Sequence, residues 1–420
     1  MDRRIESDVI IVGGRPAGAS LALRLGARGR RVLLLEKATF PSAPAVPSCP
    51  ILYSPAMRLL DELGVAESDY ADDSAKITGF GIEAEGCFST TMDVPMALGR
   101  DYGMGLDRAQ FDSMLWNRIA DCATVDRRDS CSFRDVIRDS HGVVIGVTAV
   151  DASGALEIRA PLTVGADGRF SAVARAVGAA VLDDYSEQTS TVHFADWEEL
   201  APFAPDREHM ASLCVSGRGV TVLFFPAPRG RTMVATHIRS DRVEVGGDVE
   251  RFYEAVLGQY AGVRRRLEGA RRVSKVLGIK RVANRMLEPC GRGWALVGDA
   301  LHHKDPIDGQ GIYDALLEAK LLDEHLDALD GYREAVLAAT RPMMHATVRR
   351  LRRELYEDAP PWAMRTVMRW MMTDLEYQRR FLSFLQRQEP PETWPPASLV
   401  RDAVLRGIAR DARRLFTRSA

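Results

Sequence analysis

A cluster of glycines lies between two short apolar runs in the first forty residues, and an acidic side chain follows the second run. The turn reads Gly-Gly-Arg-Pro-Ala-Gly, and its residues with a candidate role are Gly13, Gly14, Arg15 and Gly18. A glycine turn that opens a helix presents backbone N–H groups and a positive dipole end to a phosphate. Glu36, about 20 residues further on, is placed to accept hydrogen bonds from a ribose. The spacing predicts a dinucleotide site, although Arg15 stands where the fingerprint has its middle glycine.

The elements around this turn are those that a dinucleotide site needs. Asp8–Val12 is short, apolar and β-branched, which predicts a buried strand of a parallel sheet. Apolar residues recur at helical spacing over Ala19–Leu25, so we expect a helix that ends near Arg28. Val32–Leu35 then predicts a second buried strand, which ends at Glu36. Strand, glycine turn, helix, strand and acid together form the βαβ unit.

Two later stretches repeat the pattern of a strand that ends in a Gly/Asp pair. The first is Leu162–Arg169, with Asp167 and Gly168, and a helical run over Ser171–Val177 follows it. The second begins at Trp294 and contains Asp299, and a predicted helix closes it near Leu326. A carboxylate at a strand end can accept hydrogen bonds from sugar or ribityl hydroxyls. Between Asp299 and the helix lies a turn segment whose candidate residues are Pro306, Asp308, Gly309, Gln310 and Gly311.

The three motifs, in this order, resemble the FAD-dependent monooxygenases of the aromatic-hydroxylase type, which are similar to p-hydroxybenzoate hydroxylase. The resemblance runs from about Asp8 to Leu326 and is specific in the motifs. The insert before Pro306 is also similar to FAD oxidoreductases near geranylgeranyl reductases and halogenases. The resemblance implies bound FAD, NADPH or NADH as a transient electron donor, and O2. It implies hydroxylation or epoxidation of a small or medium apolar organic substrate through a flavin C4a-hydroperoxide, as in natural-product biosynthesis.

The resemblance also assigns roles to individual residues. Gly13, Gly14 and Gly18 would line the pyrophosphate, with Arg15 along the phosphates, and Glu36 would bind the adenosine ribose. Arg108 would contact the flavin, Asp299 the ribityl chain, and Asp167 and Gly168 would lie near the FAD and the transient NAD(P)H. Pro306 and Gly309–Gly311, including Gln310, would sit beside the isoalloxazine ring. Asp308 is interpreted as a helix N-cap turned away from that ring, because a carboxylate beside a reduced flavin is unfavourable.

The residue that moves protons cannot be identified from the sequence. His193 and His237, on strands predicted for an inserted substrate-binding sheet, are weak candidates for a catalytic base. Tyr53 and Tyr102 are no stronger candidates. A flavin reductase or dehydrogenase that never activates O2 is the main alternative. A halogenase is disfavoured because no tryptophan pair forms the W-x-W-x-I-P segment. A non-catalytic partner-binding protein is disfavoured because the glycines and acids of the motifs are present. Whether a separate flavin reductase supplies electrons stays open.

The order of predicted strands and helices along the chain indicates an α/β protein. It would have a Rossmann-like FAD domain, an inserted, mostly antiparallel β-sheet substrate domain, and a C-terminal helical extension. We assign residues 1–75, 99–182 and 285–330 to the FAD domain and 76–98 and 183–284 to the sheet. Short strands with turn signals follow one another through 183–284, and Val249–Glu268 is predicted as one helix. Residues 331–420 read as helices broken at Pro360-Pro361 and Pro390–Pro396. The last, Ser398–Arg418, is basic and amphipathic, and we interpret it as packed on the body rather than bound to a membrane surface.

Composition excludes several other classes of protein. The 420 residues are 46% hydrophobic and 27% charged, which is typical of a globular enzyme and not of a disordered chain. The formal net charge of −2 lacks the basic excess of a nucleic-acid binder. Six scattered cysteines without a C-x-x-C pair predict a reduced, cytoplasmic protein with no metal site. The apolar run Val9–Val12 is too short for a signal peptide, and no run is long enough to span a membrane.

Overall fold

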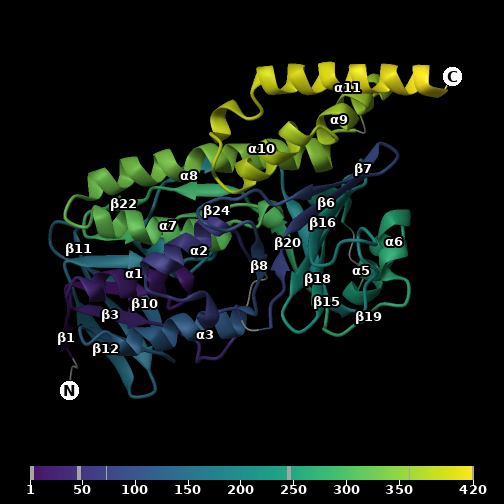
Figure 1. Ribbon diagram of the computed structural model, residues 1–420. Coiled ribbons are helices and arrows are strands. Elements are labelled where there is room, and N and C mark those ends of the chain that lie inside the picture. Colours follow the sequence, from purple (N-terminus) through teal and green to yellow (C-terminus); the bar gives the residue numbers. More distant parts are fainter. Residues whose placement is uncertain (1–3, 45–48, 72, 244–246, 359, 419–420) are drawn as a thin grey trace.

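Two large sheets and a layer of C-terminal helices make up the molecule (Figure 1). The structure is a computed structural model that describes residues 4–44, 49–71, 73–243, 247–358 and 360–418. The six-stranded sheet lies on the left of Figure 1 and the eight-stranded sheet on the right, with the C-terminal helices above both. This arrangement is the predicted α/β fold, with one mostly parallel sheet and a second, mostly antiparallel sheet.

Parallel strands form the six-stranded sheet, and the first strand alone runs antiparallel to its neighbour. The strands lie in the order β22 (Cys290–Gly291), β23 (Trp294–Leu296), β13 (Leu162–Gly165), β2 (Val9–Val12), β3 (Val32–Leu35) and β9 (Val125–Arg128). Every residue of β23, β13, β2 and β3 is buried, as expected for a parallel sheet covered on both faces. The strand order makes β23, β13 and β2, which precede the three sequence motifs, direct neighbours.

Helices and a smaller sheet pack against these strands. On the helical side, α1 (Pro16–Ala27) packs against α7 (Gly311–Glu324) and α3 (Arg108–Arg118), and α2 (Ser54–Glu62) packs on α7. The short helix α4 (Ala172–Val177) follows β13. A four-stranded sheet in the order β1 (Arg4–Glu6), β12 (Gly154–Arg159), β11 (Val144–Asp151) and β10 (Ser132–Arg138) contacts β13 through β11.

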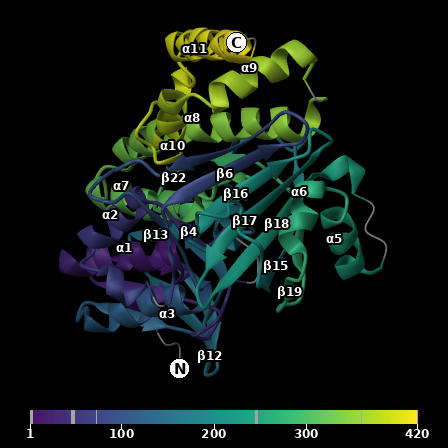
Figure 2. The ribbon, with the colours of Figure 1, turned by 45° about the vertical axis from the view of Figure 1, so that its right-hand side comes forward.

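The eight-stranded sheet is antiparallel except where β16 pairs with β6. Its strands are β19 (Arg271–Arg272), β15 (Ser190–Glu198), β18 (Arg231–Arg239), β17 (Val220–Ala227), β16 (Met210–Val215), β6 (Gly79–Ala84) and β7 (Phe88–Asp93), with β20 (Leu277–Val282) also paired to β15. Its outer face packs on α5 (Val249–Leu257) and α6 (Ala261–Leu267), to the right in Figure 2. Its inner face carries apolar side chains that pack against Ile51 and the C-terminal helices.

Two three-stranded sheets complete the β structure. One has the order β4 (Ile51–Leu52), β8 (Gly103–Gly105) and β5 (Lys76–Ile77), and the other β14 (Val181–Asp184), β21 (Arg285–Leu287) and β24 (His302–His303). Strand β8 contacts β17 and strand β4 contacts α2 and α7, so the first small sheet lies between the eight-stranded sheet and these helices.

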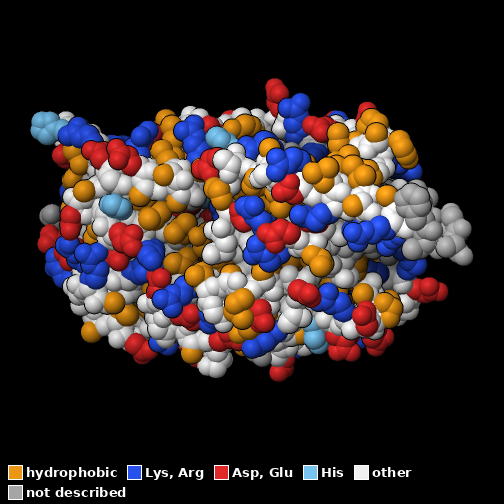
Figure 3. All heavy atoms as spheres, turned by 45° about the horizontal axis from the view of Figure 1, so that its top comes forward, with side chains coloured by type: hydrophobic (Ala, Val, Ile, Leu, Met, Phe, Trp, Pro, Cys, Tyr) orange, Lys and Arg blue, Asp and Glu red, His pale blue; other side chains and the backbone are white. Residues whose placement is uncertain are grey.

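The C-terminal region is helical and is interrupted at the predicted prolines. It consists of α8 (Leu329–Leu351), which continues into a π-helical turn at Arg352–Tyr356, then α9 (Trp362–Met372), α10 (Leu375–Leu385) and α11 (Ala397–Arg418). Basic and acidic side chains are interspersed over this face, with apolar side chains among them (Figure 3). No helix in the described ranges is long and apolar enough to cross a membrane.

Several predicted elements differ from the structure. The helix predicted over Val249–Glu268 is two helices, because Tyr260 has extended backbone angles and starts α6 as its N-cap. Strand β7 was not predicted, since its alternation is formed largely by Ser and Thr. The sequence of Met96–Leu106 also predicts a strand, but the strand is limited to Gly103–Gly105 because a tight turn joins Ala97 and Arg100.

Candidate functional site

The three sequence motifs meet at one edge of the six-stranded sheet. Gly13 follows β2, Asp167 follows β13 and Asp299 follows β23, and these strands are parallel neighbours. The backbone N–H of Ala166 donates to Val12 O at 2.8 Å, and that of Val297 donates to Gly165 O at 2.9 Å. The carboxyl ends of such strands are where open α/β sheets bind ligands.

The glycine turn is packed so closely that side chains are excluded. A Cβ on Gly18 would lie 1.8 Å from the carbonyl oxygen of Gly13, and one on Gly13 would lie 2.3 Å from that of Ala166. Gly13 also has a φ of +108°, which disfavours other residues. Among the described residues no side chain caps the N-terminus of α1, so its first-turn N–H groups face the turn without a side-chain acceptor there. These features fit a bound pyrophosphate.

Glu36 is held at the turn by the backbone. Its Oε2 accepts from the N–H of Gly14 at 2.8 Å and its Oε1 accepts from that of Ala38 at 2.9 Å. The residue is 5% exposed. Each carboxylate oxygen has more than one lone pair, so both can still accept from the two hydroxyls of a ribose.

Two arginines of the candidate site share one buried carboxylate. Arg15 Nη1 donates to Asp112 Oδ2 at 2.6 Å, and Arg108 Nε donates to Asp112 Oδ1 at 3.0 Å. The side chain of Asp112 is fully buried. Arg15 also donates to the backbone oxygen of Ser42 at 3.0 Å. Asp112 thus fixes two cations near the glycine turn, and sequence reasoning missed it because the Arg15 contact spans 97 residues.

The carboxylate of Asp167 accepts hydrogen bonds at the N-terminal end of α4. Its Oδ2 accepts from the N–H of Ala172 at 2.6 Å, and its Oδ1 accepts from the hydroxyl of Ser171 at 2.5 Å. Burial raises the pKa of Asp167, although these hydrogen bonds act in the opposite direction. Gly168, with a φ of +80°, then turns the chain toward Arg169. The structure therefore gives Asp167 a capping contact that the motif alone does not reveal.

Arg169 is a cation with unsatisfied donors. Its side chain is 9% exposed, yet Nε and Nη1 are buried without a hydrogen-bond partner among the residues that the structure describes. Its Nη2 lies 3.9 Å from Oδ2 of the exposed Asp299. Burial and the positive charge of Arg169 lower the pKa of His303 to about 4, although Asp299 acts to raise it. Unsatisfied guanidinium donors beside the strand ends fit an anionic ligand group.

The turn before α7 is anchored on several sides. A Cβ on Gly309 would lie 2.7 Å from Ile51 and 3.1 Å from the sulfur of Cys49. Gln310 donates to Leu385 O at 2.7 Å and accepts from Arg387. Gln310, not Asp308, is the N-cap residue of α7, and no side chain in the part of the protein that the structure describes caps this helix. The N-cap role interpreted for Asp308 is thus wrong.

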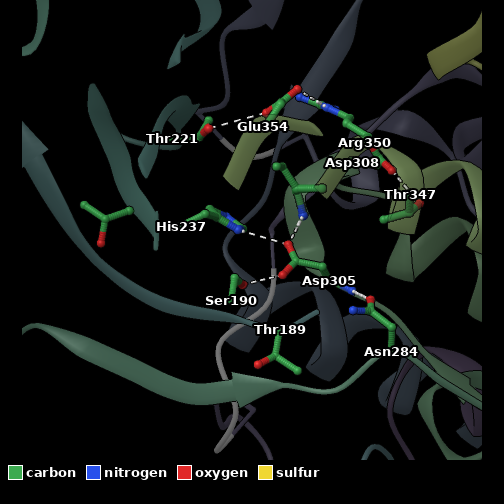
Figure 4. A network of polar contacts seen from close by, with 12 residues as sticks. Thr189, Ser190, Thr221, His237, Asn284, Asp305, Asp308, Thr347, Arg350 and Glu354 are labelled. Atoms are coloured by element: carbon green, nitrogen blue, oxygen red, sulfur yellow. Dashed lines mark hydrogen bonds and ion pairs between the residues drawn. The ribbon is translucent and has the colours of Figure 1, made fainter. Parts of the chain in front are cut away.

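Asp308 instead faces the C-terminal region (Figure 4). It accepts from Thr347 Oγ1 and pairs with Arg350 Nη1, both at 2.5 Å. The Arg350 guanidinium compensates the charge of this buried carboxylate. The side chain of Asp308 therefore points toward α8.

A buried ionic network lies behind the same turn. Asp314 on α7 pairs with Lys304 and with Arg387, whose Nη2 lies 2.6 Å from Oδ1. His302 Nδ1 lies 2.7 Å from Glu318 Oε1, and Glu318 also accepts from the N–H of Gly298. Burial alone would lower the pKa of His302, but the carboxylates of Glu318 and Asp314 raise it to about 9.

Comparison with known proteins identifies the family. A family model described as an FAD binding domain matches residues 6–333. The chain belongs to the FAD-binding domain family. The comparisons also place it among FAD-dependent oxidoreductases. It is 28% identical over 359 residues to a 6-methylpretetramide 4-monooxygenase of Streptomyces rimosus, a match that covers 80% of each chain.

Other relatives of this FAD-binding protein have different chemistries. A digeranylgeranylglycerophospholipid reductase of Methanospirillum hungatei is 26% identical, with 75% of this chain and 74% of the relative covered. The flavin-dependent brominase Bmp2 has the same fold, with a TM-score of 0.75 at 17% identity, and the match covers 96% of this chain and all of the other. The comparisons therefore establish FAD chemistry without fixing the substrate.

The FAD site offers a direct test through Arg169, which sequence reasoning did not single out. Arg169→Met is expected to weaken FAD binding about 10- to 100-fold, because a hydrogen bond to a charged group contributes about 1.5–3 kcal/mol. Fluorescence titration of the apoprotein with FAD measures this. Arg175→Met, six residues later and exposed, is the matched control and should bind FAD normally. Equal affinity of the two variants would remove Arg169 from the site.

Proposed function

We propose that this FAD-dependent oxidoreductase is a monooxygenase that uses NADPH or NADH and O2 to hydroxylate or epoxidise a small or medium apolar organic molecule. In the overall reaction the substrate RH, O2, NAD(P)H and H⁺ give ROH, NAD(P)⁺ and water. The family, the monooxygenase among the relatives and the apolar inner face of the substrate sheet support this function.

One observation carries the proposal: the turn of the third motif is bonded directly to the inner face of the eight-stranded sheet. Asp305, which precedes Pro306, contacts Ser190 on β15 and His237 on β18 (Figure 4). The same face carries Leu223, Phe225 and other apolar side chains. An apolar substrate against this face would therefore lie next to the turn Asp305–Gly311, which we call the flavin turn.

The residues present divide the work of holding FAD. Gly13, Gly14, Gly18, Arg15 and Arg169 would hold the pyrophosphate end, with Glu36 on the ribose. Asp299 would bind the ribityl chain, while Arg108, Asp167 and Gly168 would lie near it. Pro306 and Gly309–Gly311, with Gln310 held by Leu385, would adjoin the ring, where N–H groups at the start of α7 can stabilise negative charge. Bound FAD, once reduced, supplies the electrons that activate O2.

The organisation that we propose follows the sequence. Residues 1–75, 99–182 and 285–330 would form the FAD unit, 76–98 and 183–284 the substrate sheet, and 331–420 the helical extension. The six free cysteines support a reducing compartment such as the cytoplasm. A partner flavin reductase would be needed only if NAD(P)H fails to reduce the purified protein.

The experiment that tests this function is product analysis under ¹⁸O2. The purified holoenzyme is given NADPH or NADH with a panel of phenols and alkenes, and products are analysed by mass spectrometry. Incorporation of one ¹⁸O atom into a product is the expected result. A reductase, which the reductase relative favours as the second candidate, would instead add two hydrogens to an alkene without O2. That outcome would overturn the monooxygenase proposal.

A further inference from the structure

A histidine, a serine and an aspartate from three distant segments meet between the flavin turn and the substrate sheet (Figure 4). His237 Nδ1 lies 3.0 Å from Asp305 Oδ1, and Ser190 Oγ donates to Asp305 Oδ2. Both His237 and Asp305 are almost fully buried. Asn284 fixes the backbone at this point, because its Oδ1 accepts from the N–H of Asp305 at 2.7 Å.

The contacts of Asp305 define its protonation state and the tautomer of His237. The carboxylate accepts from the Ser190 hydroxyl and from the N–H of Ile307 at 3.0 Å. Burial would raise the pKa of Asp305, but His237 and these donors hold it below its ordinary value. The ionised carboxylate of Asp305 can only accept a hydrogen bond, so His237 must carry a proton on Nδ1. In a neutral imidazole the lone pair is then on Nε2.

The Nε2 lone pair of His237 has no hydrogen-bond partner among the described residues. No side chain or backbone group in the described ranges bonds to His237 Nε2. The atom also keeps some exposure, because it is absent from the set of fully buried side-chain atoms without a hydrogen-bond partner. Cross-strand pairing places His237 beside Val192 and Thr221. His237 lies on the same face of β18 as Ala235 and Met233, and these two residues pack among apolar side chains on the inner face of the sheet.

Two charged side chains that pack against this end of the sheet, Arg350 and Glu354, are paired with each other. Arg350 Nε lies 2.8 Å from Glu354 Oε1, and Arg350 also pairs with Asp308. Thr221 donates to Glu354 at 3.4 Å. His237 thus presents an open base next to an apolar wall and next to the flavin turn.

From this geometry we infer that His237 is a catalytic residue that accepts the proton of a phenolic hydroxyl on the substrate through Nε2, and that Asp305 is a positioning residue. The inference rests on the monooxygenase function proposed above. The O–H bond of the phenol breaks, its electron pair stays on oxygen, and the proton forms the new N–H bond of an imidazolium between Asp305 and the phenolate. No electrons leave the substrate in this step. The phenolate is more electron-rich than the phenol and is therefore the better acceptor of an electrophilic oxygen atom.

The test is the ionisation state of a bound chromophoric phenol. Oxidised holoenzyme is titrated with 4-nitrophenol at a pH one unit below the pKa of the probe, where about one tenth of the free probe is ionised. Difference spectra report nitrophenolate directly and need neither NADPH nor turnover. We expect the wild type to bind the probe mainly as phenolate, and His237→Gln to reduce the phenolate fraction of the bound probe about tenfold.

Two further variants make the result specific. Asp305→Asn should also lose the phenolate signature, because an amide no longer stabilises the imidazolium. His193→Gln should keep it, since this histidine contacts Phe252 of α5 on the outer face. Visible absorbance of bound FAD confirms that each variant is folded.

Three outcomes would overturn the inference. The first is a phenolate band that persists in His237→Gln, and the second is a wild type that binds the neutral phenol. The third is a wild type that binds neither 4-nitrophenol nor 2-naphthol. None of these would touch the proposed function, because ¹⁸O incorporation into an alkene would still establish a monooxygenase.

Discussion

Gly18→Ala is expected to abolish stable FAD binding and to lower the free energy of unfolding by about 2 kcal/mol or more. The added Cβ would stand 1.8 Å from the carbonyl oxygen of Gly13, so α1 would have to move away from β2. It has little freedom to do so, because α1 packs against α7 and its inward residues are buried. Displacing α1 would also displace the N–H groups that we assign to the pyrophosphate. We expect FAD affinity to fall at least about 100-fold, since positioning errors near 1 Å cost about that much.

The measurement is the ratio of flavin to protein absorbance after gel filtration, with FAD titration of the apoprotein and thermal unfolding. Gly247→Ala is the matched control, because its Cβ would meet nothing within 4 Å and its φ is not positive. That variant should retain FAD and stability. Full flavin occupancy in Gly18→Ala would contradict the placement of the pyrophosphate at this turn.

The strands and glycine turns of the FAD unit could be predicted from the sequence because their signals are local. Four buried apolar residues followed by a glycine define β2, and the short buried run Leu162–Gly165 followed by Asp167 and Gly168 defines β13, without reference to any distant contact. The hairpin of β17 and β18 has an equally local signal, because Pro226–Gly230 lies between two apolar runs and predicts a turn there. In each case the residues that determine the element are its own neighbours in the chain.

The polar partners of the site could not be predicted in this way. His237 and Asp305 are 68 residues apart, and nothing in either local segment indicates the other. Arg387, in the turn that follows α10, reaches Asp314 across 73 residues, and nothing in its local sequence indicates that contact. The sequence supplied the candidate histidine but not the carboxylate that fixes its tautomer. Only the packing of two sheets brings these groups together.

The segment from His302 to Gly311 explains how the flavin turn is held. His302 and Lys304 face the acids of α7, Asp305 faces the eight-stranded sheet, and Asp308 faces α8. A short turn with three different anchors has few ways to shift without breaking a buried ionic contact. Such preorganisation is what a site needs if charge is to develop at a fixed position.

Asp314→Asn is expected to be the most destabilising of the changes proposed for this segment, at about 3–5 kcal/mol. The carboxylate is 5% exposed and pairs with two buried cations, Lys304 and Arg387. Burial would raise the pKa of Asp314, but these cations hold it well below its ordinary value, so the group is ionised at neutral pH. The amide has nearly the same shape, and the variant therefore removes the charge while leaving both cations buried.

Urea unfolding at neutral pH, followed by circular dichroism, measures the loss. Asp323→Asn on the same helix is the control, because its partner Arg28 is 47% exposed and an exposed pair contributes about 0–1 kcal/mol. The two variants differ in burial and not in chemistry, so a difference of several kcal/mol between them would assign the effect to the buried network. If Asp314→Asn were as stable as Asp323→Asn, Lys304 and Arg387 would have found other counter-charges or water, and the network would not anchor the flavin turn.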